Sequence, residues 1–542
     1  MTWVQVYNPF GNIGLSALVA ALPLFILFYM LAIRRTPGHI AALVSTIAAI
    51  LVAIVAWSMP ANLAIHSLLV GVIFSFFPII WIIIAAMWVY NMTVEAGEFE
   101  IIKSSLAAIT PDRRLQAILI AFAFGAFMEG TAGAGTSVAI AAAMLVGLGF
   151  QPMYAIGVCM IANTVPVAFG AIGTPIIVAG QVTGIDLMSI SKIVGRQLPM
   201  LSVFVPLWMC IMMVGWKKAI DILPLIMFSG VVFAATQFLL SNFHGPYLPD
   251  ILSAMLTIVA LVVVLRHWKP ANIYRFPGEP NDDYCQVTGC TSAEIVRAWG
   301  PYAVLAVMVF LWGLGSVKAV IGNYDYVINW PWLHNLVVRT APIVAKDAPY
   351  GAAIRFSWVT SPGTAIFIAG LISLLFLPNY GFSKGVQCFG RTFKQMMKPL
   401  AQIAMILGLA FVMNYSGMSN TLGLAFAASG SLFPFFSPIL GWVGVFLTGG
   451  DSGSNALFGS LQQTTAQQIG VNPALTVAAN SSGGVAAKMI SPQSLAVACA
   501  ATGTIGEEGA VLRMTLPHSV AMCLILAVIT YLQAYALSWM LP

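Results

Sequence analysis

The chain has 542 residues, of which 60% are hydrophobic and only 7% charged, and its formal net charge is +6. Soluble proteins carry about 25% charged residues, so this composition excludes a soluble protein, and the small positive excess does not indicate a nucleic-acid partner. The apolar runs are continuous rather than alternating with period two, which excludes a transmembrane barrel. We therefore expect an all-α polytopic membrane protein.

Apolar runs long enough to cross a bilayer as helices, about 17 to 25 residues, follow one another along the chain. They lie at 12–33, 39–57, 66–90, 199–215, 219–241, 249–267, 299–316, 361–379, 396–414 and 517–541. Two further regions hold partial or broken spans. The expected total is therefore about 12 to 14 crossings.

Lys and Arg residues lie in short loops at the ends of these runs, where they set the orientation of the protein in the membrane. The first dozen residues carry no charge, whereas Arg34 and Arg35 follow the first span. We therefore expect the N-terminus outside. The later basic groups are expected in the cytoplasm, namely Lys103 with Arg113 and Arg114, Lys192 with Arg196, Lys217 with Lys218, Arg266 to Arg275, and Lys384 to Lys398.

The chain divides into a first transmembrane half, residues 1–268, a cytoplasmic polar linker, residues 269–298, and a second transmembrane half, residues 299–542. Cys285 and Cys290 lie in the linker, where a disulfide is not expected inside the cell, nor a metal site without a second Cys or His pair. Two amphipathic stretches, 94–106 and 382–397, lie flat at the membrane surface or act as plain connectors; the sequence leaves both alternatives open.

Two blocks, residues 126–184 and 447–506, resemble each other at a distance. The first contains Glu129-Gly-Thr-Ala-Gly-Ala-Gly-Thr-Ser137, Asn163-Thr164 and Thr174-Pro175; the second contains Gly449-Gly-Asp-Ser-Gly-Ser-Asn455, Asn480-Ser-Ser482 and Ser491-Pro492. In both blocks 12 positions separate the Asn from the Pro. Paired, interrupted hydrophobic segments in two halves are the best sequence indication of a transporter's binding site.

The charges around the two blocks differ. Arg113 and Arg114 precede the first block and Lys192 and Arg196 follow it, whereas no Lys or Arg occurs from 399 to 487. The positive-inside rule then places the loops of the first block inside and those of the second outside. We expect an inverted repeat with two re-entrant hairpins that enter from opposite sides and meet near the midplane.

The glycine-rich runs of both blocks break helices at membrane depth. Freed backbone groups there cost several kcal/mol unless protein, water or ligand satisfies them, and helix N-termini favour an anion. Several such ends, with hydroxyls and amides, suit a ligand with one carboxylate and one hydroxyl. Close helix packing is the alternative role for glycine.

Three ionisable residues of the blocks are expected to matter, because a charge at the bilayer centre costs about 2.5–3.5 kcal/mol on the insertion scale. Lys488 is expected to pair with a substrate carboxylate or with one of the acids. Glu129 or Asp451 is expected to carry a coupling proton. A structural Lys–acid pair that holds the hairpins together is the alternative.

An enzyme is not indicated. Gly450-Asp-Ser-Gly453 matches the nucleophile tetrapeptide of trypsin-like proteases, but that chemistry needs a His base and an orienting acid on a β fold. No phosphate-binding loop motif or zinc-protease motif is present, so ATP hydrolysis has no support in the sequence. We expect no cofactor.

Several motifs resemble the bacterial lactate permease family, which includes L-lactate and glycolate permeases. The resemblance runs from Asn8-Pro-Phe-Gly-Asn12 to Leu532-Gln-Ala-Tyr535. Specific matching stretches are Trp81-Ile-Ile-Ile-Ala-Ala86, Asn163-Thr-Val-Pro-Val-Ala-Phe-Gly170, Val178-Ala-Gly-Gln-Val-Thr-Gly-Ile185, Gly195-Arg-Gln-Leu-Pro199, Asn414-Tyr-Ser-Gly417, Phe435-Phe-Ser-Pro438, Ser454-Asn-Ala-Leu457 and Lys488-Met-Ile-Ser-Pro-Gln-Ser494.

This resemblance implies symport of protons with short 2-hydroxymonocarboxylates, such as L-lactate, D-lactate or glycolate, across the bacterial inner membrane, with the N-terminus periplasmic. Membership of the wider ion-transporter superfamily implies a homodimer and elevator-type movement. The sequence departs from the family pattern at both hairpins. It has Ala134 and Thr136-Ser137 where the family has a Phe and an Ala-Pro pair, and Gly450-Asp-Ser-Gly453 in place of Ser-Asp-Thr-Ser.

We therefore predict a secondary active, proton-coupled transporter. A Na⁺-coupled carboxylate transporter is the nearest alternative, since freed carbonyls and Asn or Ser oxygens also suit Na⁺; a membrane sensor and a membrane-embedded enzyme are weaker ones. The predicted substrate site consists of Gly133, Gly135, Asn163, Thr164, Gly453, Ser454, Asn455, Asn480, Ser481, Ser482 and Lys488, and proton coupling is assigned to Glu129 and Asp451.

Overall fold

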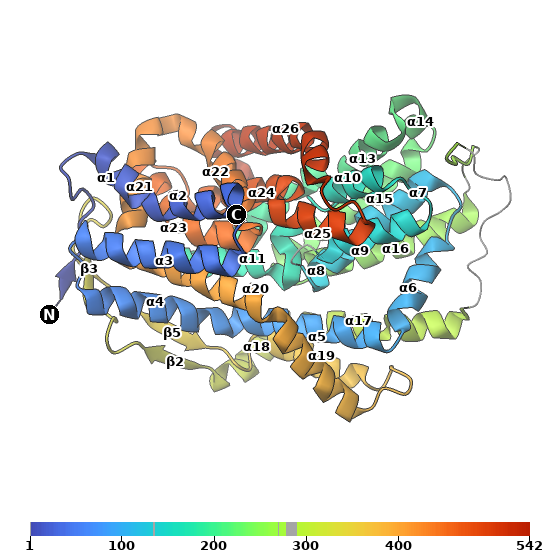
Figure 1. The fold of residues 1–542 in the computed structure, drawn as a ribbon, viewed down its shortest axis with the longest axis horizontal. Helices are drawn as coiled ribbons and strands as arrows, with labels where there is room; N and C mark the ends of the chain where they lie inside the picture. Colours follow the sequence, from blue (N-terminus) through green and yellow to red (C-terminus); the bar gives the residue numbers. More distant parts are fainter. Residues whose placement is uncertain (1, 134–135, 269, 271, 278–289) are drawn as a thin grey trace.

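A computed structural model describes residues 2–133, 136–268, 270, 272–277 and 290–542. Most helices run along the long axis of the molecule, and segments far apart in sequence lie side by side (Figure 1). The N-terminus and β3 lie at one end of this axis, and α6, α7 and α14 lie at the other (Figure 1). We call these the N-terminal end and the α7 end.

The first helices precede the first block. Gly97 has a φ of 80° between α5 and α6, a left-handed conformation that glycine adopts without strain, so α6 starts in a new direction. The helices are α1 (Ile13–Ala20), α2 (Leu22–Phe28, continued by a π-helical turn at Tyr29–Ile33), α3 (Gly38–Val55), α4 (Ala61–Ser75), α5 (Trp81–Glu95) and α6 (Glu98–Ala107).

The first block contains α8 (Gly125–Thr131), α9 (Thr136–Gly147), α10 (Pro152–Ala162) and α11 (Gly170–Thr183). It is preceded by α7 (Arg113–Ala117) and a π-helical stretch, Ile118–Phe124. The chain continues through α12 (Leu187–Ser202), α13 (Val205–Val214), α14 (Trp216–Ile220), α15 (Leu223–Phe243), α16 (Pro249–His267), α17 (Ser292–Gly313), α18 (Gly315–Ile321), α19 (Pro362–Ser373) and α20 (Phe382–Ser416).

The second block begins at the end of α22 (Phe433–Thr448) and contains α23 (Asp451–Ile469), α24 (Pro473–Ala487) and α25 (Pro492–Thr502). It lies between α21 (Met418–Phe426) and α26 (Glu508–Tyr535). The amphipathic stretch 382–397 is the first half of the 35-residue α20 and runs without interruption into the following span. It is not a separate surface helix.

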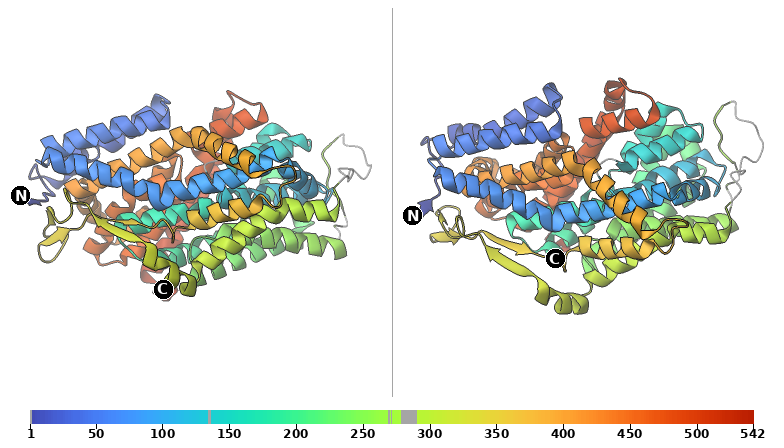
Figure 2. Two further views of the ribbon diagram at one scale, coloured as in Figure 1. Left: turned by 90° about the horizontal axis from the view of Figure 1, so that it is seen from below. Right: turned by 60° about the horizontal axis from the view of Figure 1, so that its bottom comes forward.

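Short strands, which the sequence did not predict, occupy the mixed segment between α18 and α19. β2 (Tyr326–Asn329) pairs antiparallel with β5 (Ala353–Phe356). β3 (Val337–Arg339) pairs antiparallel with β4 (Ala348–Tyr350) and parallel with the N-terminal strand β1 (Trp3–Val4), where Trp3 is opposite Val337. Figure 2 shows this yellow segment beside the N-terminus. Strand β1 from the first half of the chain and strand β3 from the second half thus pair at the N-terminal end of the molecule.

Nine helical stretches of the described residues are long and apolar enough to cross a membrane, or eleven when each bent pair is taken as one span. The interrupted pair α24 and α25 is outside this set, since α24 carries several hydroxyl and amide side chains along with its apolar ones. The sequence-based total of about 12 to 14 is higher because it also counted the run 361–379, where the helix is only Pro362–Ser373, and the partial spans of both blocks. The protein is a multi-pass helical membrane protein.

The two blocks pack in a reciprocal arrangement. The second arm of the first hairpin, α9, packs on α25, and the second arm of the second hairpin, α23, packs on α11. Because α7 leads into the first hairpin and lies at the α7 end, while α21 leads into the second hairpin and lies at the N-terminal end, the hairpins enter from opposite ends (Figure 1). This is the expected inverted repeat.

One orientation prediction is wrong. Lys192 and Arg196 were expected on the same side as Lys217 and Lys218, but α12 and α13 between them form one apolar stretch, Leu187–Val214, long enough to cross the membrane. Arg196 contacts Asn242, near the end of α15, and the carbonyl of Met540. Lys192 and Arg196 in α12 are therefore separated from Lys217 and Lys218 in α14 by a stretch long enough to cross the membrane, and they do not flank the first block on its own side.

Candidate functional site

Each block folds into a helical hairpin followed by an interrupted helix. α8 and α9 form the first hairpin, and α22 and α23 form the second. Gly133 and Gly449 have φ angles of 59° and 76° at the two hairpin turns, which favour glycine because its backbone enters the left-handed region freely. The glycine runs of the sequence thus mark the hairpin turns.

The interruptions that follow the hairpins are not equivalent, although the Asn-to-Pro spacing is equal. α10 ends directly before Asn163, and Pro166, which has no N–H to donate, follows three residues later. Asn480, by contrast, lies inside α24, which continues to Ala487 because no proline follows before Pro492. The second interruption is at Lys488, after the end of α24, so the equal Asn-to-Pro spacing does not mark equivalent helix ends.

In the first block, Glu129, Ser137 and Asn163 form one buried hydrogen-bonded cluster. The Ser137 hydroxyl donates to the Glu129 carboxylate (Oγ–Oε2 2.5 Å), and the Asn163 amide donates to both the carboxylate (3.2 Å) and the Ser137 hydroxyl (3.1 Å). Only 3% of Glu129 is exposed. The Oδ1 atom of Asn163 is buried without a partner among the described residues. This cluster ties the hairpin to the interrupted helix.

Asp250, at the start of α16, is a second buried acid next to this cluster, and the sequence analysis missed it. Only 2% of it is exposed, and both carboxylate oxygens lack a hydrogen bond among the described residues. It packs against Gly130, because a Cβ placed on Gly130 would lie 2.9 Å from the Asp250 Cβ. The sequence does carry a signal for this residue, because an acid within the apolar run 249–267 is unusual. Asp250 was missed because it lies outside both blocks.

In the second block, Asp451 begins α23 and its carboxylate accepts a short hydrogen bond from the Ser481 hydroxyl. Asn480 donates to Asn455 Oδ1 (2.8 Å) and to the Ser454 hydroxyl (3.2 Å). The Oδ1 atom of Asn480 accepts a bond from the amide of Gln462 (3.1 Å). Five of the predicted residues therefore form one network between α23 and α24, namely Asp451, Ser454, Asn455, Asn480 and Ser481.

The two blocks are joined directly by side chains of α23. The Asn455 amide donates to the carbonyl of Pro175 in α11 (2.9 Å) and to the Ser481 hydroxyl (3.2 Å). Further along, Ser460 and Gln463 donate to carbonyls of Val182 and Thr183 in α11. Asn455 thus connects the second hairpin with the interrupted helix of the first block.

Lys488, in the turn between α24 and α25, is 4% exposed. Its ammonium group donates one hydrogen bond in the described structure, to the carbonyl of Gly449 at the hairpin turn (3.1 Å). It lies near enough to Asp451 to interact electrostatically, but forms no ion pair within 4.0 Å among the described residues. Since an ammonium has three donors, Lys488 keeps donors for a ligand.

The other predicted residues have varied places. The Thr164 hydroxyl turns back to the carbonyl of Met160 in its own helix (3.4 Å), so it does not join the cluster. Ser482 is buried and its hydroxyl has no partner among the described residues. Gly453 packs against Thr448, and Gly133 packs against Ala171. Gly135, with Ala134, lies outside the described residues, and so does Cys285 of the linker.

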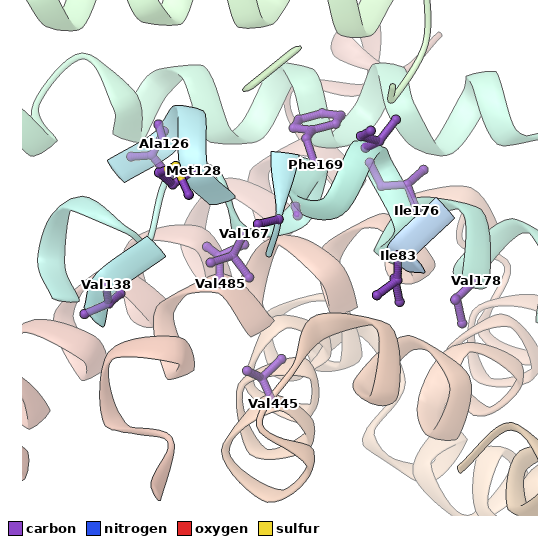
Figure 3. Close-up of a cluster of buried hydrophobic side chains, with 14 of the residues drawn as sticks. Ile83, Ala126, Met128, Val138, Val167, Phe169, Ile176, Val178, Val445 and Val485 are labelled. Atoms are coloured by element: carbon purple, nitrogen blue, oxygen red, sulfur yellow. The ribbon is translucent and has the colours of Figure 1, made fainter. Parts of the chain in front are cut away.

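Apolar side chains surround the polar clusters. Figure 3 shows Val485 of α24 beside Val167, with Met128 and Val138 of the first hairpin near it. These residues are all at most 3% exposed. Such packing excludes water, and in a water-free surrounding each polar contact is worth more than in water.

Comparison with known proteins decides the family. The family model described as L-lactate permease matches residues 16–537. The chain belongs to the L-lactate permease family. It is 49% identical to glycolate permease GlcA of Escherichia coli (strain K12) and 48% identical to L-lactate permease of Salmonella typhimurium, each over 100% of both chains. The protein is therefore a transporter and not an enzyme.

Solved structures resemble the chain less closely. The YdaH transporter of Alcanivorax borkumensis aligns with a TM-score of 0.44 and 14% sequence identity, covering 83% of this chain and 84% of that one.

Proposed function

We propose that this permease takes up short 2-hydroxymonocarboxylates, L-lactate, D-lactate or glycolate, together with protons across the bacterial inner membrane. The observation that carries this proposal is the buried Lys488, whose ammonium retains unused donors beside a network of amides and hydroxyls. A carboxylate fits the ammonium. The names of the relatives, L-lactate and glycolate permease, support the same substrate class.

In the proposed site, Lys488 binds the carboxylate while Ser481, Ser482 and Asn480 bind the carboxylate or the 2-hydroxyl group. Ser482 supports this assignment because its buried hydroxyl has no partner among the described residues. Ser454, Asn455 and Asn163 hold the hairpins and the interrupted helix in place through their mutual hydrogen bonds. Binding replaces part of this internal network.

The coupling proton is assigned to Glu129 or Asp451. Each carboxylate is buried and accepts a hydrogen bond from a neighbouring serine, an arrangement that receives and releases a proton without a charge being left unpartnered. Na⁺ coupling is the alternative, because the freed carbonyls of the interruptions also suit that cation. A periplasmic N-terminus, a homodimer and elevator-type movement of the hairpins complete the proposal.

Uptake of labelled L-lactate into proteoliposomes tests the proposal. An inward proton gradient without Na⁺ is expected to drive accumulation, and collapse of the gradient with a protonophore is expected to abolish it. Accumulation that requires Na⁺ would replace the proton by Na⁺. Absence of L-lactate, D-lactate and glycolate uptake in correctly folded protein would refute the substrate assignment.

The site assignment has a test of its own. Asn163→Ala and Asn480→Ala each remove an amide that holds a cluster together, so both variants are expected to lose transport while inserting normally into the membrane. Thr164→Val is the matched control, because the hydroxyl of Thr164 bonds only within its own helix. Normal uptake by both alanine variants at matched protein levels would refute the assignment.

A further inference from the structure

A cavity of about 450 Å³ lies at the N-terminal end, away from the predicted site residues. It is enclosed by α4, the end of α11, the last turns of α20, α23, and the segment of β3 and β4. Its polar side chains include Gln181, Asn414, Asn420, Gln463, Gln467 and Arg339. Among the described residues no carboxylate lines it, so its walls favour an anion.

Arg339, at the end of β3, brings the positive charge into this cavity. Its guanidinium lies 4.6 Å from the centre of the Tyr350 ring. Its Nε atom is shielded from solvent, and the side chain has no hydrogen bond or ion pair within the described ranges. By contrast, Arg355 nearby pairs with Asp325 at 3.1 Å. Arg339 thus presents its donor fork, which matches a carboxylate in geometry.

Two further polar atoms in the wall lack partners. Asn414, near the end of α20, is 5% exposed and its Oδ1 atom has no hydrogen bond among the described residues. The Oε1 atom of Gln181 in α11 is also buried without one. Both atoms are acceptors, so they suit the donating hydroxyl of a small hydroxy acid. A buried acceptor without a partner is costly, which a ligand would relieve.

The cavity and the buried clusters share two helices. α23 carries Asn455 of the second cluster and Gln463 of the cavity wall, eight residues apart, which is about 12 Å along a helix. α11 provides the carbonyl of Pro175 to Asn455, and Gln181 and Thr183 to the cavity. The bonds of Ser460 and Gln463 to α11 lie at the cavity wall itself. The cavity is thus at one end of the α11–α23 contact and the clusters are further along it.

We propose that the cavity is a capture site for a short hydroxymonocarboxylate on its way to the buried clusters, with Arg339 as the charge partner of the carboxylate. The identity of the ligand rests on the proposed function, whereas the anion preference rests on the cavity alone. The competing explanation is that Arg339 only braces β4 through Tyr350. If Arg339 has only that bracing role, a neutral substitution of Arg339 that keeps the fold would not change the anion preference of the cavity.

Thiol labelling of purified protein in detergent measures the anion preference without transport. Gln467→Cys places a thiol on the exposed part of the cavity wall. The labelling rate is measured with a negatively charged methanethiosulfonate, which carries a sulfonate group, and with a positively charged one, which carries a trimethylammonium group. The ratio of the first rate to the second is expected to be about tenfold higher with Arg339 present than in the double variant that also carries Arg339→Gln. Arg339→Lys keeps the charge and is expected to retain most of the preference. Val327→Cys, 63% exposed on β2, is the control outside the cavity.

L-Lactate is expected to slow the labelling of Gln467→Cys and not that of Val327→Cys, and uptake by Arg339→Gln is expected to show a KM raised about tenfold with little change in the maximal rate. An unchanged reagent preference in Arg339→Gln, with a normal unfolding temperature, would overturn the capture site. If the preference depends on Arg339 but the wild-type protein transports no hydroxymonocarboxylate, the anion site stands and the proposed transport function fails.

Discussion

The two polar clusters look alike in composition but differ in charge. The cluster of the first block contains one buried acid, Glu129, and lies next to a second, Asp250 of α16, and neither forms an ion pair in the described part of the chain. The second block combines Asp451 with the buried Lys488. Because an uncompensated buried charge is costly, the first cluster favours a bound proton or cation and the second favours an anion. We infer that the cluster of the first half binds the coupling ion and that the cluster of the second half binds the substrate anion.

Removal of the Lys488 charge is expected to have the largest effect. Lys488→Met takes away the carboxylate partner, and since hydrogen bonds to charged groups are worth about 1.5–3 kcal/mol each, uptake efficiency should fall by a factor of roughly 100 or more. Labelled L-lactate uptake at matched protein levels measures this. Lys394→Gln, an exposed position on α20, is the control. Near-normal uptake by Lys488→Met would end the assignment of an anion site to the second block.

Glu129→Gln should separate coupling from binding. The glutamine keeps a polar side chain for Ser137 and Asn163 but cannot release a proton, so proton-driven accumulation should be lost while exchange of labelled for unlabelled L-lactate continues. Asp451→Asn, beside Lys488, should lower both activities, because it alters the anion site. Equal effects of the two substitutions on accumulation and exchange would contradict the division between the clusters.

Gly484→Ala tests how tightly the second cluster is packed. A Cβ on Gly484 would lie 2.5 Å from Asp451 Oδ1 and 2.7 Å from the Val445 side chain. Overpacking of this kind costs about 1–3 kcal/mol, so the unfolding temperature in detergent should fall. Gly509→Ala in α26 has nothing within 4 Å of the new methyl group and should leave it unchanged or raise it. Equal unfolding temperatures of the two variants would contradict the tight packing.

The smallest effect is expected from the bond between the blocks. Asn455→Ala leaves the Pro175 carbonyl without its partner, at a cost of about 1–3 kcal/mol for a buried group. The unfolding temperature should fall modestly, and transport should drop because the hairpin loses its position on α11. Gln463→Ala, whose amide bonds the Thr183 carbonyl at the cavity wall, should lower the unfolding temperature less. A larger decrease in the unfolding temperature for Gln463→Ala than for Asn455→Ala would mean that the contact at the cavity wall contributes more to stability than the bond of Asn455 to Pro175.

Some features of the site were accessible from local sequence. The glycine runs predicted the two hairpin turns correctly, since positive φ angles require glycine locally. The equal spacing from Asn to Pro does not show where a helix ends, since Asn163 directly follows α10 whereas Asn480 lies within α24. The placement of Lys192 and Arg196 on the side of Lys217 and Lys218 conflicts with the span expected at 199–215, which the helical stretch Leu187–Val214 contains.

The sequence by itself determined the membrane class, the division into two halves with paired interruptions, the family, and the polar residues most worth testing, because hydrophobic run length, glycine and proline act within one segment of chain. The tertiary structure decided which of these residues meet. Asp250 joins Glu129 from a helix about 120 residues away, Asn455 reaches Pro175 across 280 positions, and Arg339 enters a cavity lined by α11, α20 and α23. Such contacts depend on how helices pack, and no local pattern carries that information.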